Sequence, residues 1–433
     1  MQTRSLILSA LFASAPALAT EPCLLTPGQP PAATGQQRVS PDNWLNPGYL
    51  RFGLSQVPRF MPGVRVQPAT PAPARAAAAT QIDLDRVTPF DPADDTRKPL
   101  RFLLDNRIDA DGVQVLHRGR LVLDYRRSGF DPTQPRLLLE ATRPVLAMLL
   151  ARAAAEGRVA REKSISRVIP ELADTRELAK LSLQRLIDGR TGLQWSASDS
   201  RQWQQEAGWT PGGNGAGVRA WLDARKQWPR SRGEDGLDLA GPEGELLLWA
   251  TENAWKQPAP ALLCGLQKSI RARDPAFWAS DPAGTALADG LALSLGDFAN
   301  LGQALLDARN QPGRRGLVPA GFVDTVATPA NPDATTPAAL RGLASDASWQ
   351  YRIAHPGGRG HHMAIIGAYG TSLYVDFDHG TVIAVFASHA ARHSPLLLAS
   401  LRNVWDEIAP MGSPPAGRSR NAGTNQPAPP QGR

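Results

Sequence analysis

Two charged residues, Glu140 and Arg143, lie three positions apart at the start of an apolar segment. On a helix this spacing puts both side chains on one face, where they can form an ion pair. A carboxylate can also act in acid–base catalysis, but it then needs a second group at a defined distance. Glu243 and Glu245 are candidates for that group only by their position in the sequence. We therefore interpret Glu140 and Arg143 as a structural ion pair.

Other reactive side chains are less well placed. Thr142 is two positions further along the same helix, about 200° around its axis, so it points away. Ser164 and Ser166 follow the helix in a connection, where hydroxyl groups usually cap helices. His361 and His362 are adjacent, but two histidines without a third ligand do not make a zinc site. We therefore expect neither a metal site nor a cofactor.

The elements that must position these residues are strands near both ends of the chain and helices between them. Residues 112–127, GVQVLHRGRLVLDYRR, alternate around Arg118-Gly119 and predict a β-hairpin. Residues 141–159 predict a buried helix, with Pro144 in its first turn and Gly157 at its end. Further patterns predict helices at 179–188, 244–257, 295–308 and 395–407, and strands at 363–366, 372–377 and 381–388. This order predicts an α+β fold whose sheet joins sequence-distant segments.

The flanking segments differ from this central region. Residues 1–19, MQTRSLILSALFASAPALA, have the pattern of a signal peptide, so we expect a periplasmic or secreted protein. We assign residues 20–97 to an N-terminal extension with a Pro/Ala-rich linker, 98–410 to the main domain and 411–433 to a disordered tail. Four aromatic residues within 42–66 suggest an arm that packs on the main domain: Trp44, Tyr49, Phe52 and Phe60.

Composition narrows the function classes. The 433 residues are 42% hydrophobic and 20% charged, which is typical of a globular protein. The net charge of +7 comes from scattered lysines and arginines, so a nucleic-acid partner is not indicated. No segment beyond the N-terminal one approaches the roughly 20 apolar residues of a membrane span. An oxidising compartment permits a bridge between the two cysteines, Cys23 and Cys264, without requiring one.

Several segments, in order, resemble the serine β-lactamase and penicillin-binding protein superfamily. Residues 137–159, LLLEATRPVLAMLLARAAAEGRV, resemble its stretch LLxSxxKSxxxxLxGxxxxEGxL. Residues 237–249, LDLAGPEGELLLW, follow FxYxSPNTxxLxW, and residues 367–388 are similar to GxxGQxLxVDPxxxxVIVxxSS. Residues 188–195, 284–306 and 317–326 match further segments, and Asn43-Trp44-Leu45 looks like the N-terminal extension of the 6-aminohexanoate-dimer hydrolase branch. The resemblance covers about residues 42–410 and implies the β-lactamase/transpeptidase-like fold, an antiparallel sheet packed with a helical domain.

The resemblance also assigns site positions, and the chain departs from the family at three of them. The serine nucleophile is replaced by Glu140, the lysine base by Arg143 and the tyrosine proton relay by Leu239. Arginine has no lone pair available and stays protonated, so it cannot act as a general base. The third family motif falls on Tyr369-Gly370-Thr371, which with His362 would bind ligand on an open sheet edge; an ordinary edge strand is an equally good interpretation.

Three hypotheses for function follow. The first is an exported pseudoenzyme that keeps a ligand pocket for a peptide, an amide or a cell-wall-like small molecule. The alternative is an active amide or ester hydrolase with a relocated nucleophile. The third is an interaction protein that works through its aromatic arm and basic Pro-rich tail; the sequence does not identify a protein partner.

Overall fold

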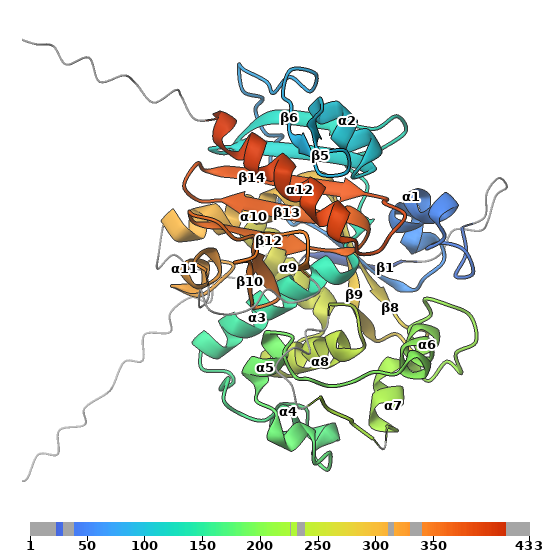
Figure 1. The fold of residues 1–433 in the computed structure, drawn as a ribbon. Coiled ribbons are helices and arrows are strands. Elements are labelled where there is room, and N and C mark those ends of the chain that lie inside the picture. Colours follow the sequence, from blue (N-terminus) through green and yellow to red (C-terminus); the bar gives the residue numbers. More distant parts are fainter. Residues whose placement is uncertain are drawn as a thin grey trace, which may run out of the picture.

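Strands from both ends of the chain form one antiparallel sheet, in the upper half of Figure 1. The computed structural model describes residues 23–28, 39–225, 227–231, 239–310, 316–329 and 340–412. Within these residues the sheet has seven strands in the order β10-β11-β12-β13-β14-β5-β6. They are β5 Ala110–His117, β6 Arg120–Arg126, β10 Ser348–Gln350, β11 Ile353–His355, β12 His362–Ile366, β13 Ser372–Asp376 and β14 Thr381–Ala387. Because β14 pairs with β5, the predicted α+β fold with a sheet of sequence-distant segments is confirmed.

The hairpin β5–β6 turns at Arg118 and Gly119, as the sequence predicts. Their φ angles are 46° and 77°, so both residues adopt the left-handed conformation that a tight two-residue hairpin needs. Glycine takes this conformation without steric cost, which explains its position in the turn.

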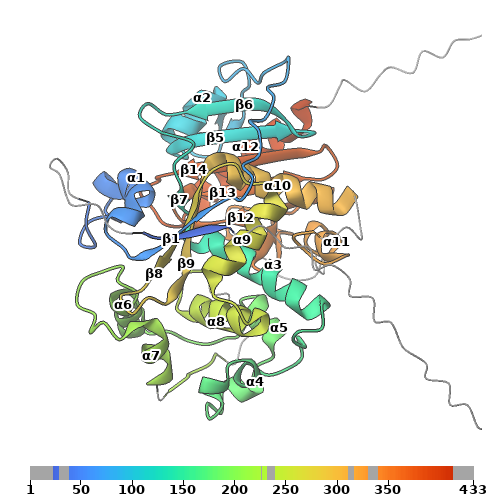
Figure 2. The same ribbon diagram turned by 180° about the vertical axis from the view of Figure 1, so that it is seen from behind.

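Side chains that alternate along the strands divide between two hydrophobic layers. Leu373 and Val375 of β13 face α10 (Leu295–Asn310), where Gly302 lets the helix approach the sheet closely. Tyr374 points the other way and stacks on Trp405 of α12 (Pro395–Ile408), with ring centroids 5.1 Å apart. Figures 1 and 2 show these two helices on opposite faces of the sheet. The layer under α12 is called the α12 face below.

A second antiparallel sheet, which the sequence does not predict, has the strand order β1-β2-β8-β9-β7. Its strands are β1 Leu24–Gly28, β2 Gly63–Gln67, β7 Arg136–Leu137, β8 Ala276–Ser280 and β9 Ala286–Leu293. A short ribbon of β3 Phe90–Asp91 and β4 Thr96–Arg97 completes the described strands. Because β1 and β2 belong to the segment 20–97, the N-terminal residues contribute to a central sheet of the molecule. The boundary at residue 97 stays a prediction.

The helix α3 (Thr142–Ala155) lies between the seven-stranded sheet and the helices of residues 165–255 in Figure 1. Every residue from 142 to 151 is buried, which confirms the predicted buried helix. The predicted helix at 179–188 is instead a 3₁₀ turn, η4 (Leu178–Lys180), followed by α5 (Leu183–Ile187), because Ser182 caps α5 through the backbone N–H of Arg185. The remaining helices are α1 Pro47–Gln56, α2 Leu100–Asn106, α4 Ile165–Val168, α6 Ala197–Glu206, α7 Gly217–Asp223, α8 Glu243–Trp255, α9 Ala259–Ile270 and α11 Phe322–Ala327, with 3₁₀ turns η1 Val57–Arg59, η2 Leu139–Ala141, η3 Pro170–Leu172, η6 Ala368–Gly370 and η7 Ala409–Gly412.

The aromatic arm packs on the main domain, as predicted. Trp44 is buried, its ring stacks on Trp209 at 5.1 Å, and its Nε1–H donates to the Trp209 carbonyl at 2.8 Å. Phe60 lies 5.6 Å from the Trp44 ring, whereas Phe52 stays half exposed on α1. The arm therefore uses Trp44 for its own attachment.

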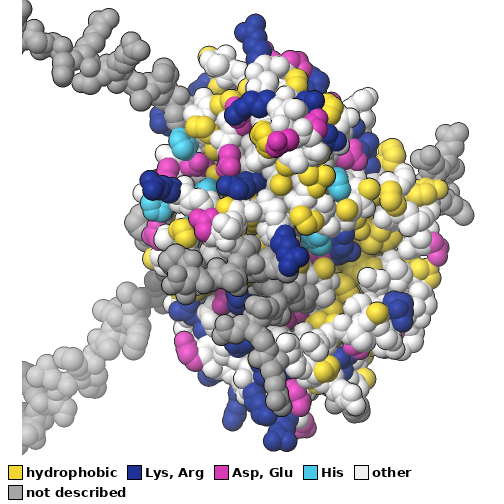
Figure 3. Space-filling model, in the orientation of Figure 1, with side chains coloured by type: hydrophobic (Ala, Val, Ile, Leu, Met, Phe, Trp, Pro, Cys, Tyr) yellow, Lys and Arg dark blue, Asp and Glu magenta, His cyan; other side chains and the backbone are white. Residues whose placement is uncertain are grey.

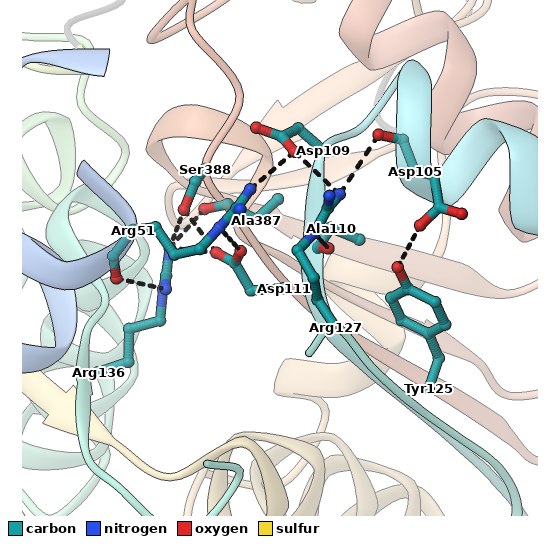
Figure 4. A network of polar contacts seen from close by, with 10 residues as sticks. All are labelled: Arg51, Asp105, Asp109, Ala110, Asp111, Tyr125, Arg127, Arg136, Ala387 and Ser388. Atoms are coloured by element: carbon teal, nitrogen blue, oxygen red, sulfur yellow. Dashed lines mark hydrogen bonds and ion pairs between the residues drawn. The ribbon is translucent and has the colours of Figure 1, made fainter. Parts of the chain in front are cut away.

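A buried polar network, drawn in Figure 4, ties the arm to the seven-stranded sheet. Asp111 at the start of β5 accepts from Arg51 of α1, from Arg136 of β7 at 2.8 Å, and from the Ser388 hydroxyl that follows β14. Arg136 also donates to the Ala387 carbonyl at 2.7 Å. Since Asp111 and Arg136 are fully buried, each offsets the desolvation of the other, and the four segments are held at one point.

The predicted signal peptide and almost all of the predicted disordered tail lie outside the described residues. Among the helices of the described chain, none combines the length and the apolar character that a bilayer span requires. On the face seen in Figure 3, positive and negative side chains are interspersed, and hydrophobic side chains gather toward the right.

Candidate functional site

Glu140 lies in the turn η2, directly before α3, and its carboxylate is almost fully buried. The residue before it, Leu139, has a φ angle of 49°, an uncommon left-handed conformation for a side chain of this size. Such backbone strain is often found at functional sites of proteins. This strained turn presents the side chain of Glu140, the residue that the resemblance aligns with the family serine.

The partner of Glu140 is Arg392, and not Arg143 as we expected from their spacing. Both Nε and Nη2 of Arg392 lie 2.6 Å from one carboxylate oxygen of Glu140. His393 lies 3.6 Å from the same oxygen. Burial opposes ionisation of Glu140, but Arg392, and after it His393, outweighs burial, so the pKa of the Glu140 carboxyl lies well below its usual range. Glu140 is therefore a fixed anion at neutral pH.

Arg143 is held by a carboxylate from another element. Its guanidinium donates to both oxygens of Asp289 on β9, at 2.8 and 3.0 Å, and to the carbonyl of Gly241 at 2.8 Å. Arg143 and Asp289 are each only 1% exposed. A Cβ atom at Gly244 would lie 2.8 Å from Nε of Arg143, so the helix α8 needs glycine at this position to leave room for the guanidinium. The expected Glu140–Arg143 ion pair is thus replaced by two separate pairs.

A third carboxyl group, Glu245 of α8, completes the buried cluster. Its two oxygens accept from Nε1–H of Trp203 at 3.1 Å and from the backbone N–H of Ala288 at 3.0 Å. Burial, followed by the nearby charge of Asp289, raises the pKa of Glu245 to about 8. Glu245 is therefore largely protonated at neutral pH. The other candidate acid, Glu243, accepts hydrogen bonds from Arg352 at 2.6 Å and from the Thr191 hydroxyl.

Leu239 lies two residues before Gly241, whose carbonyl accepts a hydrogen bond from Arg143. The Leu239 side chain is half-buried and packs against the hydrophobic cluster of the α12 face. As an aliphatic side chain, Leu239 has no proton to donate at the position that the resemblance aligns with the family tyrosine. The structure therefore links the segment of Leu239 to Arg143 through the Gly241 carbonyl, while the Leu239 side chain itself packs against a different hydrophobic cluster from the one around Glu140.

Tyr369 of the third motif lies close to Glu140, with Arg392 between them. The Arg392 guanidinium is 5.8 Å from the Tyr369 ring centroid, and burial raises the pKa of the Tyr369 hydroxyl. Tyr369 has a φ angle of 58° within η6. Gly370 instead faces Ala387 and Ile108, and Thr371 is buried directly before β13.

The expected open sheet edge at this motif is wrong. The strands β10 and β11 extend the sheet beyond β12, so β12 and β13 are interior strands with both edges paired. This hairpin was absent from the expected strands, because each of its arms has only three residues. Ligand binding by Tyr369, Gly370 and Thr371 stays a prediction, but it cannot use a free strand edge there.

His362 is separated from the group around Glu140. Its Nδ1 lies 2.9 Å from the Tyr374 hydroxyl, and its ring meets that of His355 at 4.5 Å. Tyr374 belongs to the α12 face, whereas Glu140 and α3 lie on the other side of the sheet. Burial lowers the pKa of His362, which favours its neutral form. His362 therefore does not line the same site as Glu140.

Sequence reasoning missed three residues of this site: Asp289, Arg392 and His393. Asp289 was detectable, because it is the one charged residue in the apolar stretch ALADGLAL of β9, and a buried charge requires a partner. Arg392 and His393 lie in the loop after β14, where no periodicity marks them. Thr142 is fully buried and its hydroxyl has no hydrogen-bond partner within the described chain, so no base accompanies it. The described residues contain no group of three or more His, Cys, Asp or Glu that could hold a metal ion.

Comparisons with known proteins bear on the fold and on the sequence resemblance. No family model matches the chain. The 6-aminohexanoate-dimer hydrolase of Paenarthrobacter ureafaciens is 24% identical over 375 residues, which cover 83% of this chain and 90% of that protein. The solved structure of a candidate 6-aminohexanoate-dimer hydrolase from Bacillus anthracis has a TM-score of 0.73 and 20% identity, and covers 87% of this chain and 98% of its own. Simvastatin synthase from Aspergillus terreus has a TM-score of 0.51 and 13% identity, over 72% of this chain and 96% of its own. The chain thus has the β-lactamase/transpeptidase-like fold of these structures, and over most of its length its sequence is similar to that of a 6-aminohexanoate-dimer hydrolase.

Proposed function

We propose that this protein is a pseudoenzyme of its superfamily, which binds a ligand in the former pocket without acyl transfer. The observation that carries the proposal is the environment of Arg143. At the position of the family base stands a guanidinium that is fully buried and bound by both oxygens of Asp289. A guanidinium in such a contact has no lone pair to accept the proton of a nucleophile.

The other two positions support the same conclusion. Glu140 is ionised and bound by Arg392, and its attack on an amide or ester would form a reactive anhydride. Leu239 has no proton to give to a leaving group. Loss of a nucleophile alone costs roughly six orders of magnitude in rate in comparable enzymes, and here the base and the proton relay are replaced as well.

A retained binding role is supported by the second oxygen of Glu140. This Oε2 atom is buried and accepts no hydrogen bond within the described chain. An unsatisfied buried acceptor costs about 1–3 kcal/mol, and an N–H group of a ligand would remove that cost. We therefore propose a peptide, an amide or a cell-wall-like fragment whose N–H group reaches Glu140, after the partly exposed Arg392 side chain has moved. With the signal-peptide pattern of residues 1–19, the proposal includes export to the periplasm or the medium.

Covalent labelling tests the loss of chemistry. The purified protein should give no stoichiometric adduct with a fluorophosphonate or a penicillin probe, and no turnover of esters, β-lactams, short amides or the 6-aminohexanoate dimer. Turnover by the parent protein would refute the proposal. If an adduct formed, mass spectrometry would identify the relocated nucleophile of the alternative hydrolase hypothesis.

Restored motif residues test whether the pocket survives. The variant Glu140→Ser, Arg143→Lys, Leu239→Tyr supplies the three family groups, but Asp289 would face the new lysine and keep it protonated. We therefore expect turnover mainly when Asp289→Ala is added to the three changes. The triple variant, which keeps Asp289, is the matched control for the effect of removing the Asp289 carboxylate. If neither variant gained activity over the parent while both remained folded, the retained pocket would be refuted.

A further inference from the structure

The only two cysteines of the chain, Cys23 and Cys264, lie side by side although they are far apart in the sequence. Both are half-buried and pack against the same hydrophobic core. They line one cavity of about 1060 Å³ together with Pro68 and Gln267. The nearby Cys23 contributes, after burial, to raising the pKa of the Cys264 thiol.

The fold explains this proximity. Leu25 of β1 pairs with Val66 of β2, and Cys23 is two residues before Leu25, so both side chains point to the same side of the strand. The helix α9 is bound to the same strand β2, because Nε2 of Gln267 donates to the Val66 carbonyl at 3.2 Å. Cys264 is three residues before Gln267 and therefore lies on the same face of α9. One strand pair and one helix turn thus bring the two thiols together.

We propose that Cys23 and Cys264 form a disulfide bond that fastens β1 to α9. The structure holds both residues as thiols, so the bond requires an oxidant. The oxidant belongs to the class of disulfide donors, such as a protein dithiol oxidase or oxidised glutathione.

The exchange proceeds in two steps. The Cys23 thiolate attacks a sulfur of the oxidant disulfide, which gives a mixed disulfide and releases one oxidant thiolate. The Cys264 thiolate then attacks the Cys23 sulfur and releases the second oxidant thiolate. Two electrons pass to the oxidant, and the two protons of the cysteines end on its thiols or in solvent. Burial, followed by contact with Cys23, raises the pKa of the Cys264 thiol to about 12, which makes Cys264 the weaker first nucleophile.

The bond would protect the outer strand of the second sheet. Within the part of the chain that the structure describes, β1 pairs with β2 alone, so it can detach without disturbing the rest of the sheet. A cross-link to α9 closes a loop of more than half the chain and prevents this detachment. It does not involve Glu140 or Arg143, so the inference does not depend on the proposed function.

Thiol counting by intact mass tests the inference. The full chain is purified without reductant after secretion into the periplasm of a bacterial host, and it is denatured in N-ethylmaleimide. We expect no added label before reduction and two labels after reduction, in monomeric protein. Peptide mapping should find the Cys23 and Cys264 peptides linked, and Cys264→Ser should expose one free thiol.

A second experiment tests whether the two thiols are close enough to form the bond, independently of the compartment in which the protein is made. Protein from a reducing cytosol is treated with oxidised glutathione, and it should lose both free thiols without dimer formation. Hydrogen exchange of the β1 amides should then slow by about tenfold or more, while that of β13 stays unchanged. Two free thiols after this treatment, or linkage only between molecules, would overturn the inference.

Discussion

Glu245→Gln tests whether the buried carboxyl group of Glu245, which lies near Asp289, is protonated in the folded protein. Burial and Asp289 raise the pKa of Glu245 to about 8, from an ordinary value of 4.5. In the unfolded chain the carboxyl group ionises near its ordinary pKa, whereas in the folded protein it keeps its proton up to about pH 8. The contribution of Glu245 to stability is therefore complete below pH 4.5 and is lost as the pH rises through 8.

The magnitude follows from the same two pKa values. When the titration is complete, the loss reaches about 5 kcal/mol, of which roughly 4 kcal/mol develops between pH 5 and 9. Glutamine has no proton to lose, so this dependence disappears in the variant. The variant also loses one of the two hydrogen bonds from Trp203 and Ala288, at a cost of about 1–3 kcal/mol that does not depend on pH.

The assay is urea denaturation of the parent and the variant at intervals from pH 5 to pH 9. The free energy of unfolding of the variant should rise relative to that of the parent by several kcal/mol across this range. Other groups, such as Asp297, titrate in both proteins and cancel in the difference. The exposed Glu162→Gln is the matched control and should show a flat difference. A flat difference for Glu245→Gln would mean that Glu245 is ionised in the folded protein, and our account of the cluster would be wrong.

Three further substitutions test single contacts. Asp289→Asn removes the carboxylate that binds the buried Arg143 guanidinium and should lower the free energy of unfolding by about 3–5 kcal/mol in urea denaturation, with partial recovery when Arg143→Met is added. Trp44→Ala should cost about 3–5 kcal/mol and speed proteolysis of the N-terminal arm, and a loss below about 1 kcal/mol would contradict the packing described above. Arg392→Met removes the cation that lowers the pKa of Glu140. A carboxyl group whose pKa is lowered by folding stabilises the protein only at pH values above its pKa in the unfolded chain. Arg392→Met should therefore lower the free energy of unfolding more at pH 7 than at pH 3, and an equal decrease at both pH values would refute this pairing.

The elements with local patterns were predictable. The hairpin β5–β6 follows from alternation around Arg118-Gly119, and α3 follows from an apolar segment that ends at Gly157. The resemblance in ordered segments predicted the fold class, which the structure and its neighbours confirm. The second sheet was not predictable in the same way, because β7 has two residues and β1 contains Pro27, so neither has a recognisable alternation.

For the candidate site, too, some features follow from the sequence and others only from the tertiary structure. The sequence alone determined that the segment resembling the family's nucleophile motif carries a carboxylate at Glu140 and a guanidinium at Arg143, because residue identity does not depend on the fold. It could not determine their partners. Asp289 lies 146 residues from Arg143, and Arg392 lies 252 residues from Glu140, so the spacing of three between the two charges suggested a pair that does not form. Only the tertiary structure decided the pairing, because a buried charge takes the partner that the chain path brings within reach.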